Sequence, residues 1–329
     1  MRPDARRWFE RRTSAAADWP AARLVDAKHR RDGAPATVSV VLPALDESAT
    51  IGPIVDAIRR ELVDGLPMVD ELVVVDSGSS DATARIATDA GATVVHHADV
   101  LPEAGTRSGK GEALWKSLHA TTGELVVFVD SDLLDFTASF VTGLLGPLLT
   151  DPTVAFVKAT YDRALDTGAL VLPAGGGRVT ELVARPLLNL HWPALAGFVQ
   201  PLAGEYAGRR SVLEQLPFVC GYGVELALLV DLHDTVGLDA LAQVDLGRRA
   251  HRNRDDAALG RMAAAIWRTA LLRLAAEGRL SVDDEPPPAL TQFRRTGASY
   301  DVVTTEVDVD ERPPIVTVPG YAGRRAVAS

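Results

Sequence analysis

Two aspartates stand one residue apart directly after a strongly apolar stretch of the chain. In ELVVFVDSDLLDF (124–136), the apolar residues 125–129 are followed by Asp130, Ser131 and Asp132. Alternate residues leave a strand end on the same side, so both carboxylates can face one ligand. One carboxylate can then hold Mg²⁺ or Mn²⁺ while the other bonds a sugar or ribose hydroxyl. The alternative is that the two aspartates only cap the helix that follows.

Further carboxylates are expected at the same edge of the molecule. Glu47 and Asp76 each follow another apolar stretch of the chain. Four negative charges brought together need a cation, and a divalent metal ion supplies one. Mg²⁺ binds few protein carboxylates and takes the rest of its coordination shell from water and from the phosphates of a substrate.

A lysine flanked by glycines is the cationic candidate for binding a diphosphate. Lys110 lies in GTRSGKGE (105–112), which fails as a P-loop because Gly111 stands where Ser or Thr would hold Mg²⁺. An ATPase is therefore not indicated. A lysine in the first turn of a helix still suits a diphosphate, and the alternative is a solvated surface lysine.

Two segments of the second half contain residue types that bind anions or metals. GGGRVTEL (175–182) has three glycines before a predicted helix, followed by Arg178 and Thr180. It is either a nest for phosphate or carboxylate groups or a flexible loop that starts a helix. His251, in HRN (251–253), is either a metal ligand through its neutral imidazole or an ordinary surface histidine.

The segments that must position these residues alternate between predicted strands and predicted helices. Apolar runs predict strands at 37–43, 69–76, 92–97, 124–130 and 153–161. Helical spacing predicts helices at 48–62 with Ser48 as N-cap, 79–91, 109–123 and 136–150. This alternation predicts an α/β fold with a mostly parallel sheet and helices on both faces. Ligands of such sheets bind outside the carboxyl ends of the strands, where the acidic residues lie.

Beyond about residue 161 the pattern is looser. The predicted elements are a Gly-rich loop and helix (172–192), a polar loop and helix (201–216), a helix (221–234), a strand and basic segment (241–253) and a helix (255–278). From Ser281 the chain is rich in Pro and charge, which favours an extended arm. We therefore divide the chain into an N-terminal helical lead-in (1–36), a first half (37–160), a second half (161–280) and a C-terminal arm (281–329).

The composition excludes several classes of function. The 329 residues are 47% hydrophobic and 24% charged, which is ordinary for a globular protein. A net charge of −10 argues against nucleic acid as a partner but is compatible with small anionic substrates. The single cysteine, Cys220, excludes an intrachain disulfide and fits a reducing compartment. The charged N-terminus and the lack of a long apolar run predict a soluble, cytoplasmic protein with no membrane span.

Taken together, the motifs resemble those of GT-A (Rossmann-like) glycosyltransferases. Four first-half motifs are shared by many such enzymes: VVLPALDESATI (40–51), VVVDSGSSDAT (73–83), GKGEAL (109–114) and FVDSDL (128–133). Later motifs, which are more specific, are similar to those of the actinobacterial glucosyl-3-phosphoglycerate synthases: GGGRVTELVARPLLN (175–189), PLAGEYAGRR (201–210), GYGVELALL (221–229), QVDLGRRAHRN (243–253) and LTQF (290–293).

The resemblance implies a reaction and its partners. Glucose would pass from UDP-glucose to D-3-phosphoglycerate with retention at the anomeric carbon, giving glucosyl-3-phosphoglycerate for the methylglucose lipopolysaccharide pathway. A Mg²⁺ or Mn²⁺ cofactor and a homodimer are also implied. Residues 37–160 would form the nucleotide-sugar-binding half, and residues 161–280 would bind the acceptor and complete the metal site.

The resemblance also implies roles for individual residues. The uridine pocket would be lined by Pro43, Ala44, Leu45, Glu47 and Ser77. The diphosphate would be contacted by Lys110 and Arg249, and the rest of the donor by Asp130 and Ser131. The metal would be held by Asp132 and His251. The glucose and reacting centre would face Tyr222 and Glu225, with Lys110 and Asp130 beside them. The phosphoglycerate would be bound by Gly177, Arg178, Thr180 and Asn253.

The chain departs from the family pattern at one visible position. Asp46 stands where the first motif usually has Asn, beside the predicted uridine site, so it bears on the choice of donor base. No Ser/His/Asp constellation and no obvious carboxylate nucleophile is evident in the sequence. A retaining reaction would then proceed by front-face attack, with the departing phosphate oxygen helping to deprotonate the acceptor.

Four other functions are compatible with parts of the sequence. A mannosyl-3-phosphoglycerate synthase using GDP-mannose differs only weakly, through the second-half motifs. A polyprenyl-phosphate glycosyltransferase shares the first-half motifs but should carry a membrane anchor. A nucleotide-sugar-binding regulator should lack the paired aspartates or the acceptor loop. A nucleotidyltransferase should carry a Gly-rich basic loop after the first strand, where this chain has PALDES (43–48).

Overall fold

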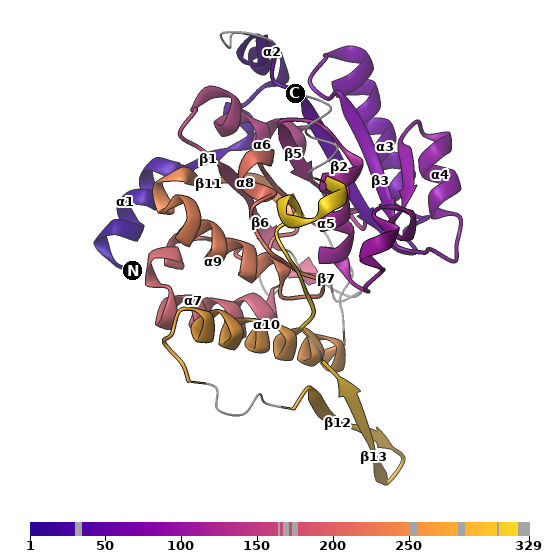
Figure 1. Cartoon of the computed structure of the whole chain (residues 1–329), viewed down its shortest axis with the longest axis vertical. Coiled ribbons are helices and arrows are strands. Elements are labelled where there is room, and N and C mark those ends of the chain that lie inside the picture. The colour runs from indigo at the N-terminus through magenta and orange to yellow at the C-terminus, as the bar shows by residue number, and fades with distance from the viewer. Residues whose placement is uncertain are drawn as a thin grey trace.

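A single large sheet forms the centre of the molecule, with helices on both faces (Figure 1). The computed structural model describes residues 1–29, 35–163, 165–166, 171–172, 177–249, 255–281, 287–307 and 309–321. Within these residues the sheet has eight strands, in the spatial order β1 (Thr13–Ala15), β11 (Leu241–Arg249), β6 (Phe156–Arg163), β9 (Tyr206–Arg209), β5 (Leu125–Phe128), β2 (Val38–Ala44), β3 (Glu71–Asp76) and β4 (Thr93–His96).

The predicted mostly parallel α/β sheet is confirmed. Every neighbouring pair in the large sheet is parallel except the two pairs that β9 makes with β5 and β6. Side chains alternate between the two faces, as the pleat of a strand requires. Val41, Val126 and Phe128 enter one apolar cluster, whereas Val40 and Val127 enter the other.

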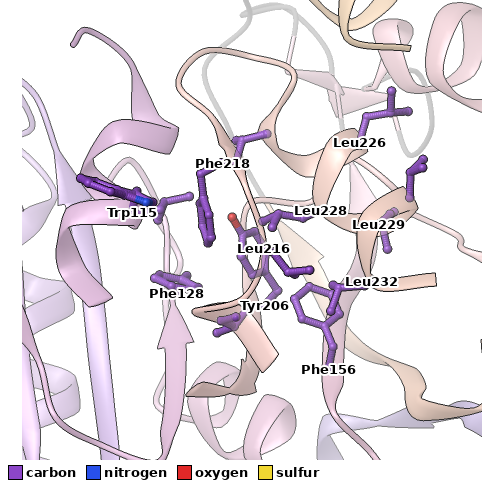
Figure 2. Packing of buried hydrophobic residues seen from close by; sticks show 14 of the residues in the cluster. Trp115, Phe128, Phe156, Tyr206, Leu216, Phe218, Leu226, Leu228, Leu229 and Leu232 are labelled. Carbon is purple, nitrogen blue, oxygen red and sulfur yellow. The ribbon is translucent and has the colours of Figure 1, made fainter. Parts of the chain in front are cut away.

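Each apolar cluster is completed by its own set of helices. One cluster includes side chains from α2 (Ala21–His29), α3 (Ile51–Ile58), α4 (Thr83–Asp89) and α6 (Ser139–Thr150). The other includes side chains from α1 (Pro3–Arg12), α5 (Lys110–Ala120), α7 (Arg185–His191), α9 (Val224–Val236) and α10 (Asp256–Ala276). Figure 2 shows the second cluster, where Trp115 of α5 and the leucines of α9 surround Phe128, Phe156 and Tyr206 from the sheet.

Several predicted element ends were wrong. The strand predicted to run to Asp130 ends at Phe128, and the helix predicted to start near residue 48 starts at Ile51 after Thr50. The N-cap is Thr50 and not Ser48. Ser48 lies in the preceding turn, where its backbone N–H donates to Asp81 Oδ2 at 3.1 Å. The helix continues beyond Ile58 as a wider π-helical turn, Arg59–Gly65.

Strand β9 was not predicted. Its residues belong to 201–216, which was interpreted as a polar loop because glycines lie at positions 204 and 208 and arginines at 209 and 210. In the structure β9 pairs with both neighbours and leads into the short helix α8 (Arg210–Leu213). The four residues are too few to carry an alternating pattern, and burial between two strands outweighs the weak strand preference of Gly208.

Both ends of the described chain contribute to the main body. The N-terminal segment supplies β1, which pairs with β11 at the edge of the sheet. The C-terminal region forms a projecting hairpin of β12 (Ala289–Thr296) and β13 (Ser299–Glu306), so it is not simply extended (Figure 1). Two small ladders complete the fold: β7 (Leu165–Asp166) with β8 (Val171–Leu172), and β14 (Glu311–Arg312) with β10 (Phe218–Val219). No helix in the described part of the chain is long and apolar enough to cross a membrane.

Candidate active site

The strand order places a natural binding edge between β2 and β5. From β2 the chain runs outward to β3 and β4, and it then crosses back to β5 on the other side of β2. Ligands of open α/β sheets bind at such a reversal, outside the carboxyl ends of the strands. Because β9 is antiparallel to β5 and β6, its amino end lies at this same edge, where Tyr206 is in register with Phe128 and Lys158.

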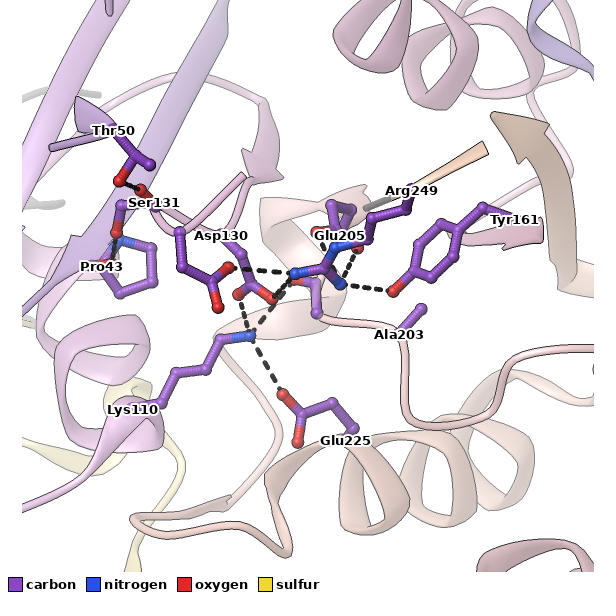
Figure 3. Close-up of polar contacts among 12 residues, drawn as sticks. Pro43, Thr50, Lys110, Asp130, Ser131, Tyr161, Ala203, Glu205, Glu225 and Arg249 are labelled. Carbon is purple, nitrogen blue, oxygen red and sulfur yellow. Dashed lines mark hydrogen bonds and ion pairs between the residues drawn. The ribbon is translucent and has the colours of Figure 1, made fainter. Parts of the chain in front are cut away.

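Lys110 lies at the start of α5 and connects the two halves of the chain (Figure 3). Its Nζ donates to Asp130 Oδ1, to Glu225 Oε1 at 3.1 Å and to the backbone oxygen of Gly204 at 3.4 Å. Asp130 follows β5, and Glu225 lies in the first turn of α9. The lysine side chain is 27% exposed and therefore remains open to a ligand.

Arg249, the last residue of β11, forms the second centre of positive charge. Its NH2 group lies 3.1 Å from both Asp130 Oδ2 and Asp132 Oδ1. Its NH1 group donates to Tyr161 Oη at 2.6 Å and lies 3.1 Å from Glu205 Oε1. We call Lys110, Arg249 and the four carboxyl groups that they contact the site network: Asp130, Asp132, Glu205 and Glu225.

The two cations and Asp130 hold one another in the charged form. Burial lowers the pKa of Lys110, but the carboxylates of Asp130 and Glu225 outweigh it and raise the pKa well above its usual value. Burial raises the pKa of Asp130, but Lys110 and Arg249 outweigh it and hold the pKa well below its usual range. At neutral pH the edge therefore carries fixed charges of both signs.

Buried polar side chains support the site network from the interior of the protein. Burial raises the pKa of the Glu205 carboxyl, although the neighbouring Arg249 opposes the change. Burial also lowers the pKa of Lys158 to about 7. Lys158 Nζ donates to Ala203 O at 2.9 Å and lies 4.6 Å from the centre of the Tyr206 ring. These contacts fix the backbone that leads into β9.

Gly204 is required by its contact with Asp130. A Cβ atom at this position would lie 2.1 Å from Asp130 Oδ2 and 2.5 Å from Oδ1. The carboxylate therefore packs directly on the backbone before β9, where any larger residue would displace it. This contact explains why a glycine precedes Glu205 at the amino end of an antiparallel strand.

The predicted uridine-pocket residues lie on the loops after β2 and β3. Pro43 and Ala44 end β2, Leu45 is exposed beyond it, and Ser77 N–H donates to Ala44 O at 2.9 Å. Glu47 N–H donates to the hydroxyl of Thr83 at 2.8 Å. The two loops are thus joined into one surface beside the carboxyl end of β5.

Ser131 is buried and links that surface to the site network. Its hydroxyl donates to Pro43 O, and its own carbonyl accepts from Thr50 Oγ1 at 2.5 Å. The serine therefore fixes the loop between Asp130 and Asp132 against β2. Its predicted contact with the donor stays a prediction.

The expected gathering of four strand-end carboxylates is only partly correct. Asp130 and Asp132 share Arg249, but Asp76 is buried and accepts from Ser79 within its own turn. Asp76 is therefore a turn-forming residue, and Glu205 and Glu225 join the network from the second half of the chain.

The structure describes three of the four residues predicted to bind the acceptor, and their surroundings differ. Arg178 NH1 pairs with Asp256 Oδ1 at 2.5 Å, at the start of α10. Gly177 has a positive φ of 83°, which suits glycine, and the Thr180 side chain is buried with no hydrogen-bond partner for its hydroxyl among the described residues. The predictions for His251 and Asn253 lie outside the described residues.

Tyr222 and Glu225 flank the start of α9. Tyr222 is 47% exposed and Glu225 bonds Lys110, so one predicted reacting-centre residue is open to solvent and the other belongs to the network. Both lie on the second half of the chain, and Glu225 contacts the lysine from the first half. This arrangement suits a donor held by one half and an acceptor brought by the other.

The donor chemistry of the network fits a divalent cation. Four carboxyl groups meet two cationic side chains, and Asp132 is 42% exposed with oxygen donors that hard cations prefer. No group of three or more His, Cys, Asp or Glu side chains in the described ranges is arranged to hold a metal by itself. A metal here would therefore take further ligands from a substrate.

Sequence reasoning missed Tyr161, Lys158 and Glu205 as residues that support the site. Glu205 lay within the quoted motif PLAGEYAGRR, but this motif was interpreted as a loop. The available signal was the sequence GEYA (204–207), in which an acidic residue precedes two residues that the structure buries, Tyr206 and Ala207. Tyr161 and Lys158 lie on a predicted strand, where a buried lysine is unusual enough to have indicated a role.

Comparisons with known proteins identify the family to which the chain belongs. Residues 39–215 match the model described as glycosyl transferase family 2. A curated glucosyl-3-phosphoglycerate synthase from Mycolicibacterium paratuberculosis is 49% identical over 94% of this chain and 92% of its own.

Two solved structures extend the comparison to the fold. The glucosyl-3-phosphoglycerate synthase of Mycobacterium tuberculosis, in complex with Mn²⁺, UDP and phosphoglyceric acid, has a TM-score of 0.78 and 47% identity, covering 90% of this chain and 94% of that one. The mannosyl-3-phosphoglycerate synthase of Rubrobacter xylanophilus has a TM-score of 0.85 and 39% identity, covering 94% and 97%.

The class of protein follows from the sheet, its edge and the matching family model. This chain belongs to glycosyl transferase family 2, in the branch of the glucosyl-3-phosphoglycerate synthases. The GT-A resemblance predicted from the motifs is thereby confirmed.

Proposed function

We propose that the protein transfers glucose from UDP-glucose to D-3-phosphoglycerate with retention, giving glucosyl-3-phosphoglycerate. The observation that carries the proposal is the site network, in which Lys110 and Arg249 stand at the edge where nucleotide sugars bind in this fold. Curated relatives named glucosyl-3-phosphoglycerate synthase, and a solved relative with UDP and phosphoglyceric acid bound, support the choice of substrates.

The charge of the network fits the chemistry of the leaving group. UDP leaves only when its developing negative charge is neutralised, and preorganised cations supply that stabilisation. Lys110 is held protonated and partly exposed, and Arg249 is fixed by Tyr161 and Glu205. Both cations therefore stand ready at the edge without needing to reorganise during the reaction.

A divalent cation, Mg²⁺ or Mn²⁺, would be held by Asp132, with His251 as the second predicted ligand. When bound, it neutralises diphosphate charge as a Lewis acid. Asp130 and Ser131 would contact the donor, and its uridine pocket would be lined by Pro43, Ala44, Leu45, Glu47 and Ser77. The excess of carboxyl groups in the network supports this assignment.

The acceptor would approach from the second half of the chain. Gly177, Arg178, Thr180 and Asn253 would bind its phosphate and carboxylate, with Tyr222 and Glu225 beside the reacting centre. Glu225 is ion-paired with Lys110, so we assign it to positioning that cation and propose front-face attack as the mechanism. A covalent sugar adduct trapped on Glu225 would contradict that mechanism.

The test is nucleotide release by the purified protein with Mg²⁺ across a matrix of substrates. The donors are UDP-glucose, ADP-glucose and GDP-mannose, and the acceptors are 3-phosphoglycerate, glycerate and water. We expect UDP to appear only with UDP-glucose and 3-phosphoglycerate together, and mass spectrometry to find glucosyl-3-phosphoglycerate. No release with any pair, despite tight UDP binding, would overturn the proposal in favour of a binding protein.

One alternative donor is favoured by a specific observation. The mannosyl-3-phosphoglycerate synthase structure has the higher TM-score of the two structures compared, at 0.85. The same matrix separates the two functions, because nucleotide release with GDP-mannose instead of UDP-glucose would assign the chain to mannosyl transfer. The higher sequence identity to the glucosyl enzymes makes glucose the expected sugar.

The homodimer and the cytoplasmic location stay predictions. The hairpin of β12 and β13 projects from the body and exposes the side chains of Phe293, Tyr300 and Val302, which a second copy would cover. Light scattering of the purified chain would give twice the monomer mass if the dimer forms. Cell fractionation would test the location.

A further inference from the structure

We propose that the C-terminal segment 310–316 is a strap that positions Lys110, and that Arg312 is the positioning residue through which it acts. The inference rests on the proposed function, because it assigns Arg312 an effect on the reaction through Lys110. Nothing in the sequence motifs marks this segment, which was predicted to belong to an extended arm.

The strap reaches the start of α5 through the backbone. Its two-residue strand β14 pairs with β10, so that Arg312 is in register with Phe218. Cys220 N–H donates to Asp310 O at 2.8 Å, and Cys220 O accepts from Gly111 N–H at 2.8 Å. An unbroken row of backbone hydrogen bonds therefore runs from the strap to the residue after Lys110.

The start of α5 lies against that row at very close range. A Cβ at Gly109 would lie 2.3 Å from Cys220 O, and a Cβ at Gly111 would lie 1.8 Å from Val219 O. Both glycines that flank Lys110 are therefore required for contact with the backbone of 219–220. Any movement of that backbone must move the residue between them.

Arg312 fixes the same turn of α5 through its side chain. Its Nε and NH2 groups donate to the two oxygens of Glu112, both at 2.7 Å. Glu112 is fully buried and lies two residues after Lys110 in the first turn of the helix. A bidentate pair of this kind fixes direction as well as distance.

The remaining donors of Arg312 fix the loop before α5. NH1 donates to Ala104 O at 2.7 Å, and NH2 donates to Gly105 O at 3.0 Å. Arg107 returns the contact by donating from NH1 to Glu311 O at 2.7 Å. The guanidinium of Arg312 is therefore a single point that joins the preceding loop and the first turn of α5.

The strap also reaches the helix that carries Glu225. Glu311 Oε1 lies 2.5 Å from Arg273 NH2 on α10, and Arg273 forms two 2.7 Å hydrogen bonds with Asp231 on α9. Glu225 lies in the first turn of α9, and Asp231 lies near the middle of this helix. Residues 311 and 312 therefore connect both helices whose side chains meet in the Lys110–Glu225 ion pair.

A matched control lies at the far end of α5. Arg210 is also buried, and it donates to Leu118 O, to Gly123 O and to the hydroxyl of Thr121. It binds the carboxyl end of the same helix, away from Lys110. Replacing either arginine by glutamine removes a buried cation that contacts one end of α5. Of the two arginines, Arg312 is the one that contacts the turn carrying Lys110.

The experiment compares Arg312→Gln and Arg210→Gln in the full-length protein, using urea denaturation and steady-state kinetics with UDP-glucose and 3-phosphoglycerate. We expect both variants to lose stability. We expect kcat to fall about ten- to hundredfold only in Arg312→Gln, since a displacement on the order of 1 Å costs about 10²-fold. Arg312→Lys, which keeps the charge without the fork, should recover part of the rate.

A double-mutant cycle with Lys110→Ala separates positioning from general loss of structure. If Arg312 acts through Lys110, then Arg312→Gln lowers kcat less than about threefold in the Lys110→Ala background, while its effect on stability stays the same. An equal fall of kcat in both backgrounds, or an equal fall in Arg210→Gln and Arg312→Gln, would overturn the proposal.

A milder variant decides the matter if Arg312→Gln does not fold. Trp115→Phe removes the hydrogen bond from Trp115 Nε1 to Pro313 O, at 2.8 Å, and keeps an aromatic ring in the core. We expect it to lower kcat severalfold in the wild-type background but not with Lys110→Ala, and unchanged kcat would overturn the proposal. Absence of glucosyl transfer by the wild-type protein would instead refute the proposed function.

Discussion

Two charged networks meet at the first turns of α5. They differ in the ratio of carboxyl groups to cations and in the solvent exposure of their side chains. The site network contains four carboxyl groups for two cations, and its Lys110 and Asp132 are 27% and 42% exposed. The strap network, formed by Glu112, Lys116 and Arg312, contains one carboxylate for two cations, and its carboxylate and lysine side chains are fully buried.

The difference separates a site for chemistry from a structural junction. The cations of the strap network use backbone carbonyls as further acceptors, as when Lys116 donates to His97 O and Gly105 O at 2.8 and 2.9 Å. In the site network Asp132 is the most exposed carboxylate, at 42%, and suits an added cation. Changes in the site network should therefore lower activity with little loss of stability, whereas changes in the strap network should lower stability and also, through the position of Lys110, kcat.

The largest effect is expected for Asp132→Ala. Removing the predicted metal ligand should lower UDP release by on the order of 10³-fold, because the leaving group loses its Lewis acid. The free energy of unfolding should change by less than about 1 kcal/mol, since the side chain is 42% exposed and Arg249 keeps Asp130 and Glu205 as partners. Nucleotide-release kinetics and urea denaturation measure the two quantities. Asp135→Ala, an exposed aspartate of the same loop, is the control and should keep wild-type activity.

A large loss of stability is expected for Glu112→Gln, together with the fall in kcat that loss of its contact with Arg312 should cause. It leaves Arg312 buried without its anionic partner, and loss of one member of a buried pair costs about 3 kcal/mol of unfolding free energy. Urea denaturation at neutral pH gives this value, with the exposed Glu103→Gln as control. A loss below about 1 kcal/mol would remove the contrast between the networks.

A pH effect is expected below the site network at Lys158. Burial lowers its pKa from 10.5 to about 7, so between these values the unfolded chain binds more protons than the folded protein. Stability should therefore rise with pH from about 7 to 10.5, by at most ~1.4 kcal/mol per pH unit from this group. Thermal or urea unfolding across that range should show a flatter profile in Lys158→Met. Identical profiles would contradict a neutral Lys158 in the folded protein.

The smallest effect is expected at Asp46. The residue has a positive φ of 56°, a conformation that Asp and Asn tolerate better than other side chains with a Cβ. Its carboxylate accepts from the Ser80 N–H at 2.7 Å, which an Asn amide oxygen can also do. Asp46→Asn should change KM for UDP-glucose less than about threefold. A switch from UDP- to GDP-sugars in this variant would show that Asp46 selects the base.

The strands, and the placement of Lys110, Asp130 and Asp132 at their carboxyl edge, were predictable because their patterns are local. Apolar runs marked β2, β3 and β5, and Asp130 and Asp132 follow one of these runs directly. Lys110 was marked by its glycines, whose requirement is confirmed by their close contact with the backbone of 219–220. Each of these signals lies within a few residues of the feature that it predicts.

The remaining parts depend on partners far along the chain. Glu205 enters the site only because β9 is antiparallel and inserts between β5 and β6, which no pattern within its four residues indicates. The contact between Arg312 and Glu112 joins residues 200 positions apart. Local spacing carries no information about such pairs, so sequence reasoning assigned the strap to an extended arm.

Mn²⁺ binding in the presence of UDP, followed by electron paramagnetic resonance, tests most directly whether the site network holds the metal. We expect the wild-type protein and Glu112→Gln both to bind Mn²⁺, whereas Asp132→Ala, equally folded, should not. Equal binding of Mn²⁺ by Asp132→Ala and the wild-type protein would contradict the claim that the carboxyl-rich site network holds the metal.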